Sequence, residues 1–159
     1  TDQLDQILAG EYALEERALL HAAIHRGAEI LDASDALNDV VISRGQYVRP
    51  IHVQANINGY ELAAYTADGL IIATPTGSTA YALAVGGPIL PPEMRNTLIV
   101  PIAPHRSLEH AIVLPEGTAV NITVRTSHQA VVSVDGQDPH SVENEDAVNI
   151  ETSKKIRRP

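Results

Sequence analysis

The sequence predicts a mainly β fold, a β-sandwich with one or two short helices, and three observations support this prediction. Residues 51–57 read IHVQANI, in which apolar and polar side chains alternate, and Asn58-Gly59 follows at once. This is a strong hairpin signal, because both turn residues must accept a positive φ. Short apolar runs separated by proline and glycine fill the rest of the chain, as is typical of a sandwich. The chain contains no Phe or Trp and five Tyr, so its core must consist of Val, Ile, Leu and Ala.

The strands follow from apolar runs and their periodicity. The first hairpin returns along residues 60–66. Residues 120–124 and 130–134 alternate in the same way on either side of a polar turn at Ser127-His128, so we expect them to form a second hairpin. The remaining strands are expected at 70–73, 98–102, 111–114 and about 147–151.

Two segments have helical character. Residues 13–24, ALEERALLHAAI, have good helix propensity and could place Leu14, Ala18 and Ile24 on one face. A second helix is expected to start near Ser78, where Ser78 or Thr76 could cap the free amide groups. Gly86-Gly87-Pro88 then ends it.

Composition limits the function. A chain of 159 residues with 44% hydrophobic and 19% charged residues is expected to form one domain, over residues 1–151, followed by a flexible basic tail at 152–159. It has no cysteine, no apolar run long enough to cross a bilayer and no signal-peptide pattern, which indicates a cytoplasmic protein with no membrane partner. The net charge of −9 argues against nucleic-acid binding.

The stretch TPTGSTAYALAVGG (74–87) has hydroxyls and glycines before a short alanine-rich helix, with no charged residue. A helix start exposes unpaired N–H groups, which suit a hydroxyl-rich or anionic ligand. A capped, closely packed helix without any ligand would have the same pattern. If a ligand binds here, the neutral donors favour a nucleoside over a bare phosphate.

Residues 68–89, DGLIIATPTGSTAYALAVGGPI, closely resemble the signature of the NAD kinase family, in which this stretch joins a strand to the substrate-binding helix. Three further stretches resemble the family in the same order along the chain: ALNDVVISRG (36–45), LIVPIAPHRSLEHAIVLPEG (98–117) and VVSVDGQ (131–137). The agreement extends from about residue 8 to residue 151. It implies the C-terminal β domain of the NAD kinase/diacylglycerol kinase-like fold, and it favours a strand over a helix in the first third.

The family also has a Gly-Gly-Asp-Gly-Thr motif in an N-terminal domain, whose aspartate is thought to act as the general base. This sequence does not contain that motif, and it begins with Thr1 rather than methionine. We therefore expect a trimmed product or a piece of a longer protein, with no catalytic residue and no metal ligand in this chain.

The resemblance implies that Asn38 and Asp39 contact the adenosine of the substrate. An amide can both donate and accept, and a carboxylate can accept from two ribose hydroxyls. Relatives usually have Glu at the second position, so the contact of the shorter Asp39 stays open. Asn-Asp pairs also favour turns and caps without any ligand.

The resemblance further implies that Thr76, Thr79, Ala80 and Tyr81 surround the adenine and ribose. A small Ala lets a ring approach, and Tyr81 offers a flat face with a polar tip. A half-buried core tyrosine is the alternative for Tyr81.

Asp68 and Ala103 resemble the positions that face the nicotinamide end, contributed in some assemblies by a neighbouring subunit. A carboxylate can accept a hydrogen bond from a carboxamide. A purely structural turn at Asp68-Gly69 is the alternative.

These points predict the NAD-binding domain of an NAD kinase, which uses ATP and Mg²⁺ to convert NAD to NADP and assembles as a homodimer or homotetramer. The isolated chain is expected to bind NAD or NADP without catalysis. Three alternatives stay open: a non-catalytic NAD(P)-binding module, an oligomerisation sandwich, and a related lipid kinase domain.

Overall fold

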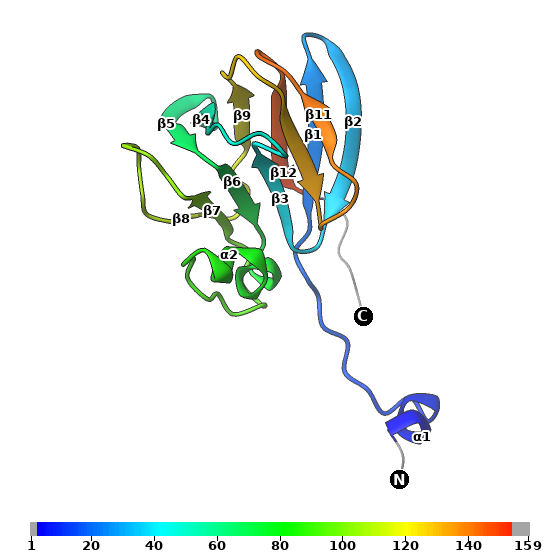
Figure 1. The fold of residues 1–159 in the computed structure, drawn as a ribbon. Helices are drawn as coiled ribbons and strands as arrows, with labels where there is room; N and C mark the ends of the chain where they lie inside the picture. The colour runs from blue at the N-terminus through cyan, green and yellow to red at the C-terminus, as the bar shows by residue number, and fades with distance from the viewer. Residues whose placement is uncertain (1–2, 154–159) are drawn as a thin grey trace.

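Two six-stranded antiparallel sheets form the two layers of the structure, a computed structural model that describes residues 3–153 (Figure 1). The first sheet has the order β2-β1-β12-β9-β4-β5 and the second the order β11-β10-β3-β6-β7-β8. The strands are β1 (Leu20–Arg26), β2 (Glu29–Ala36), β3 (Asp39–Ser43), β4 (Ile51–Ile57), β5 (Tyr60–Ala67), β6 (Gly69–Ala73), β7 (Thr97–Ile102), β8 (Ile112–Leu114), β9 (Val120–Val124), β10 (Ala130–Val134), β11 (His140–Val142) and β12 (Ala147–Thr152). The mainly β sandwich predicted from the sequence is therefore confirmed.

The main core lies between the two sheets and is built almost entirely from aliphatic side chains, with Tyr65 as its aromatic member. Strands of both sheets bury every second residue, as in the pattern of Val120, Ile122 and Val124 along β9. A strand that faces water on one side buries alternate side chains in this way. The absence of Phe and Trp is thus compensated by many Val, Ile and Leu contacts.

The hairpin of β4 and β5 forms as predicted. Asn58 and Gly59 adopt φ angles of 49° and 84°, the two positive values that a tight hairpin turn of this type requires. The Asn58 side chain also accepts a hydrogen bond from the backbone of Ala119 at 2.9 Å. This bond ties the turn to the strand beside it in the sheet.

The second predicted hairpin is wrong, although both of its strands exist. β9 pairs with β4 and β12 in the first sheet, whereas β10 pairs with β3 and β11 in the second. Strands that face each other across a sandwich bury alternate residues just as paired strands do, so the sequence pattern is the same for both arrangements. Residues 125–129 are long enough to cross the spacing of about 10 Å between packed sheets.

The helix that the local pattern favours at residues 13–24 does not form, and the strand that the family resemblance favours in this part of the chain does. Residues from Leu20 onward form β1, which buries Leu20, Ala22 and Ile24 between β12 and β2. Pairing on both sides outweighs the local helix propensity. A short helix does precede this segment, α1 (Gln3–Leu8), and all its residues are exposed. Of the predicted basic tail, residues 154–159 lie outside the described residues, and Thr152 ends β12.

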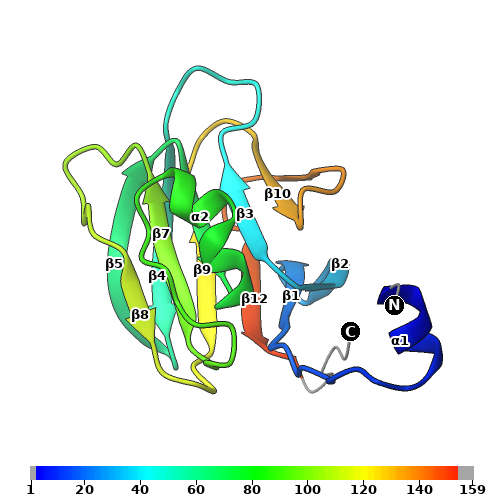
Figure 2. The same cartoon turned by 90° about the horizontal axis from the view of Figure 1, so that it is seen from below.

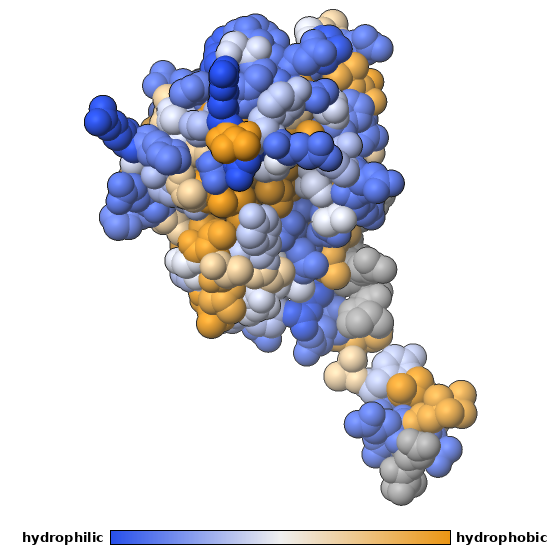
Figure 3. Space-filling model, in the orientation of Figure 1, coloured by the Kyte–Doolittle hydropathy of each residue, from blue (hydrophilic) through white to orange (hydrophobic). Residues whose placement is uncertain are grey.

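A second apolar cluster lies on the outer face of the second sheet. Strand β6 is buried on both faces: Leu70 and Ile72 point into the main core, while Ile71 and Ala73 pack under the helix α2 (Tyr81–Ala84) and the loop after it. Figure 1 shows α2 at the end of this sheet where β3 starts and β6 ends, and Figure 2, seen from below, shows α2 in front of the strands. In Figure 3 hydrophobic side chains gather there and on α1, and Leu83 and Ile89 are among the exposed residues of this region. No helix in residues 3–153 is long and apolar enough to cross a membrane.

The ion pair of Arg26 and Asp146 links β1 to the turn before β12 and gives a test of the fold. The guanidinium donates to both carboxylate oxygens, at 2.9 and 2.8 Å, and Asp146 is buried. These hydrogen bonds hold the pKa of Asp146 below its ordinary value, even though burial acts in the opposite direction.

Asp146→Asn should therefore lower the free energy of unfolding at neutral pH. The stabilisation is present above the ordinary aspartate pKa of about 3.9 and is lost as the pH falls through the lower pKa of the folded state. Urea unfolding at pH 7 and pH 3 should show a difference between wild type and variant that shrinks on acidification. A constant difference would contradict this account of the pair.

Candidate functional site

The carboxylate of Asp135 holds the loop that connects β2 to β3. Its two oxygens accept hydrogen bonds from three consecutive backbone N–H groups, those of Leu37 at 2.7 Å, Asn38 at 2.8 Å and Asp39 at 3.1 Å. The backbone N–H of Asp135 donates in return to the Asp39 carbonyl at 2.9 Å. Four hydrogen bonds thus fix the position from which the side chains of Asn38 and Asp39 project.

The turn between β10 and β11 aims this carboxylate. Asp135 and Gly136 both have positive φ angles, 50° and 69°, and the N–H of Gln137 donates to the Val134 carbonyl at 3.0 Å. Two successive positive φ angles define the mirror-image hairpin turn that Asp-Gly favours. In the sequence, Asp135 stands only within the stretch VVSVDGQ that resembles the family, and no role at the site was predicted for it.

On its other side the same loop is held by the segment 74–77. The Thr74 hydroxyl donates to the Leu37 carbonyl at 2.5 Å and accepts from the Gly77 N–H at 3.0 Å. The Thr74 N–H donates to the Asn38 carbonyl at 2.9 Å. The two backbones approach so closely that a β-carbon on Gly77 would lie 2.0 Å from the Asn38 carbonyl oxygen. Only glycine fits at this position.

The helix after this segment differs from the predicted one. A single 3₁₀ turn, η1 (Thr76–Thr79), is followed by the four-residue α2, and the break lies at Ala80. Neither Ser78 nor Thr76 caps it through the side chain. The Ser78 hydroxyl is buried, donates to the Pro75 carbonyl at 2.6 Å and accepts from the Leu90 N–H at 3.0 Å. The Thr74 hydroxyl instead accepts from the Gly77 N–H within the first turn.

A groove of about 380 Å³ opens beside this helix, on the outer face of β3 and β10. Four predicted site residues line it together, Asn38, Asp39, Ala80 and Tyr81. Tyr81 is 45% exposed, so it is not a core tyrosine. Such a volume is within the range of small-molecule sites.

Thr76 and Thr79 lie in the same turn but do not line the groove. The Thr76 hydroxyl is buried and has no hydrogen-bond partner within residues 3–153. The exposed Thr79 hydroxyl donates to the Thr76 carbonyl at 3.2 Å. The hydroxyls of this stretch therefore largely build the turn itself.

Asp39 is the polar group of the groove with the most unusual surroundings. It is only 6% exposed, and no donor within the described residues reaches its carboxylate. Burial raises the pKa of Asp39, and the nearby negative charge of Asp135 raises it further. A ligand hydroxyl in the groove could donate a hydrogen bond to this carboxylate.

Asp68 and Ala103 lie at the opposite end of the sheet. Asp68 precedes β6 and Thr74 follows it, so the two ends are about 20 Å apart at about 3.3 Å per residue. The Asp68 carboxylate lies 3.4 Å from the Arg44 guanidinium, and Ala103 has a φ of 45°. Asp68 and Ala103 are adjacent, because Gly69 pairs with Ile102. Within one chain they are remote from the groove.

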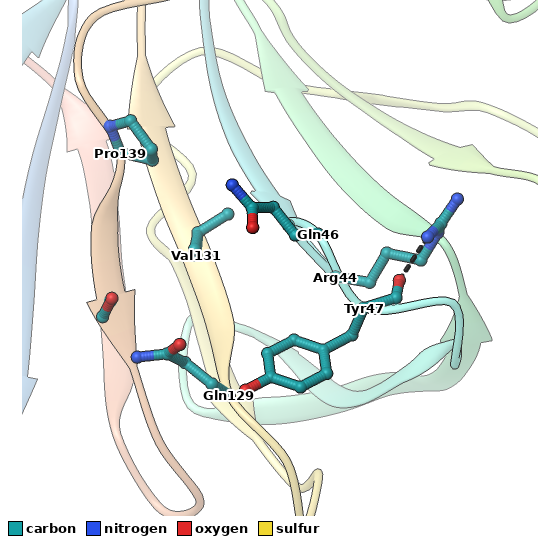
Figure 4. A pocket seen from close by; sticks show the side chains of 8 residues that line it. Arg44, Gln46, Tyr47, Gln129, Val131 and Pro139 are labelled. Carbon is teal, nitrogen blue, oxygen red and sulfur yellow. Dashed lines mark hydrogen bonds between the residues drawn. The ribbon is translucent and has the colours of Figure 1, made fainter.

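A larger cavity of about 590 Å³ lies near this opposite end (Figure 4). The Tyr47 ring extends along it toward Gln129, and the Arg44 guanidinium donates to the Tyr47 carbonyl. No residue of its lining was predicted from the sequence to bind a ligand, although one of them, Arg44, pairs with Asp68. Its size alone does not make it the site.

The fold is a two-sheet β-sandwich with a groove of small-molecule size between a short helix and the outer face of its second sheet. The sequence identifies the family: residues 37–158 match the model of the ATP-NAD kinase C-terminal domain. The chain is 46% identical over 135 residues to an NAD kinase of Heliobacterium modesticaldum, and this match covers 84% of this chain and 48% of that protein. It is 41% identical over 162 residues to an NAD kinase of Symbiobacterium thermophilum, with 99% of this chain and 57% of that protein covered.

Two solved structures of NAD(H) kinases resemble this chain. A crystal structure of yeast NADH kinase complexed with NADH matches with a TM-score of 0.87 and 29% identity, over 94% of this chain and 44% of that one. An NAD kinase from Archaeoglobus fulgidus in complex with ATP matches with a TM-score of 0.79 and 25% identity, over 98% of this chain and 58% of that one. The chain therefore belongs to the ATP-NAD kinase family, as its C-terminal domain. It spans about half the length of the curated relatives it matches.

The close approach of Gly77 to Asn38 can be tested directly. Gly77→Ala should lower the free energy of unfolding by about 3 kcal/mol or more, because overpacking costs about 1–3 kcal/mol even where neighbours can move and here the neighbour is backbone. Gly117→Ala is the control: nothing lies within 4 Å of its β-carbon position, so only the left-handed penalty of about 1–2 kcal/mol applies. Equal urea midpoints for the two variants would contradict the contact.

Proposed function

We propose that this chain is the substrate-binding part of an NAD kinase, and that the groove beside Tyr81 binds the adenosine of NAD. The enzyme would transfer the γ-phosphoryl group of ATP to the 2′-hydroxyl of the adenosine ribose. The observation that supports this best is the groove itself, where a buried carboxylate without a donor lies beside an amide and an exposed tyrosine. The family membership of the chain supports the same reaction.

The roles of the groove residues follow from their chemistry. The Asp39 carboxylate would accept from ribose hydroxyls, and Asn38 would both donate to and accept from the nucleoside. Ala80 leaves room for the purine beside the flat ring of Tyr81. Thr76 and Thr79 would hold the turn around the adenine and ribose rather than lie under them. The chain thus contributes positioning, the main requirement of phosphoryl transfer besides electrostatic stabilisation.

The reaction also needs a general base and a phosphoryl donor with its metal. This sequence has no Gly-Gly-Asp-Gly-Thr motif, and in residues 3–153 no group of three or more His, Asp or Glu side chains is placed to hold a metal ion. We assign no catalytic step to the described residues. We expect the chain alone to bind NAD or NADP and to form no NADP from NAD and ATP.

The position of Asp68 and Ala103 favours an assembly. Because they lie about 20 Å from the groove along β6, they could reach the nicotinamide end of the same ligand only from another copy of the chain. In a symmetric dimer each copy offers the same surface to the other, so each groove would receive the partner copy's equivalent of these residues. A cytoplasmic homodimer or homotetramer is our proposal for the whole protein.

Calorimetric titration of the chain with NAD, NADP and ATP tests the binding site. Tyr81→Ala and Asn38→Ala should each weaken NAD binding about tenfold or more, since each removes a group that lines the groove. Tyr60→Ala is the matched control, because Tyr60 is 80% exposed at a hairpin outside the groove, and it should leave the affinity unchanged. Unaltered binding in both groove variants would contradict the proposal and favour a structural or oligomerisation role. Detectable NADP from the pure chain with ATP and Mg²⁺ would show that the general base has been misassigned.

A further inference from the structure

We propose that Asp135 is a positioning residue for nucleoside binding, whose carboxylate fixes the backbone of residues 37–39 and thereby aims Asn38 and Asp39 into the groove. This inference deepens the proposed function and rests on it. Asp135 lies 97 residues from Asn38 along the chain, and its bonds to the loop go to backbone groups alone. It therefore controls the place of the two side chains without competing with them for the ligand.

The geometry gives Asp135 a role that other side chains cannot easily replace. Three consecutive N–H groups that point to one spot form an anion-binding concavity, and the carboxylate satisfies all three at 2.7–3.1 Å. Without it, these partly buried donors would lose their acceptors, which costs more than the loss of an exposed hydrogen bond. The loop would then be free to move Asn38 and Asp39 away from the ligand.

Asp135 also sets the charge that Asp39 experiences. Among the described residues that line the groove, Asp39 and Asp135 carry the only ionisable carboxylates, and no Lys, Arg or His is present. Asp135 has three donors around it, whereas Asp39 has none. The charge of Asp135 adds to burial in raising the pKa of Asp39. As the pH falls, Asp39 thus takes up its proton earlier than an ordinary aspartate and ceases to accept from two ribose hydroxyls.

Asp135→Asn tests both effects at once. The variant keeps one oxygen for the Asn38 and Asp39 amides, but its NH₂ group faces the Leu37 N–H, donor against donor. We expect the Kd for NAD at pH 7 to rise about tenfold. We also expect the carboxyl of Asp39, followed by ¹³C NMR, to titrate at a lower pH than in wild type, because a neighbouring negative charge has gone.

Thr74→Val is the matched control. It releases the same loop from its other side by removing the bond from the Thr74 hydroxyl to the Leu37 carbonyl, yet it removes no charge. It should weaken NAD binding and leave the Asp39 midpoint where it is in wild type. An unchanged Kd in Asp135→Asn, or an equal shift of the Asp39 midpoint in both variants, would overturn the proposal.

The unmodified chain provides a test that does not depend on a variant folding. If Asp135 holds the loop, the amide groups of Leu37, Asn38 and Asp39 should show NMR scalar couplings across their hydrogen bonds to the side-chain carboxyl carbon of Asp135. The absence of all three couplings would overturn the proposal. A wild-type chain that binds no NAD would contradict the proposed function, whereas these couplings would still decide whether Asp135 positions the loop.

Discussion

The site depends on the contact between two backbone segments that approach too closely for any side chain to lie between them. Gly77 meets the carbonyl of Asn38, and a β-carbon there would be only 2.0 Å from that oxygen. Thr74 joins the two segments by hydrogen bonds to both, and Ser78 anchors the following loop at Leu90. This explains why the stretch 74–81 is so rich in hydroxyls and small residues: Thr74 and Ser78 satisfy buried backbone groups, which leaves Ala80 and Tyr81 to line the groove.

Local structure could be predicted from the sequence where one segment determines it alone. The Asn58-Gly59 hairpin and the buried β6 are of this kind, because turn chemistry and apolar runs are local properties. The pairing of β9 and β10 is not, since alternate burial looks the same for strands paired side by side and for strands opposed across a sandwich. The local pattern of residues 13–24 predicts a helix wrongly for a related reason. Leu20, Ala22 and Ile24 form a strand because they pair with β2 and β12, which lie elsewhere in the sequence.

The candidate site shows the same division. Asn38, Asp39, Ala80 and Tyr81 could be named from the resemblance to a family, and the structure brings them to one groove. Asp135 was visible only as part of an Asp-Gly turn. No periodicity or spacing could reveal that this turn points its carboxylate at amides 96 to 98 residues earlier. An acceptor for backbone donors leaves no mark on the sequence of the loop it holds, because its hydrogen bonds come from backbone N–H groups, which every residue except proline has.

The charge of the groove limits which part of a nucleotide can lie in it. Its described lining includes two aspartates and no basic side chain, so phosphate groups placed there would be repelled, whereas uncharged sugar hydroxyls could donate to Asp39. Phosphate recognition normally relies on Arg, Lys, a metal ion or a set of free backbone N–H groups, and here the three converging N–H groups of residues 37–39 are already occupied by Asp135. The internal carboxylate thus takes the position that an anion would otherwise fill. Under the proposed function, a groove arranged in this way would select the nucleoside and would leave the phosphates outside it.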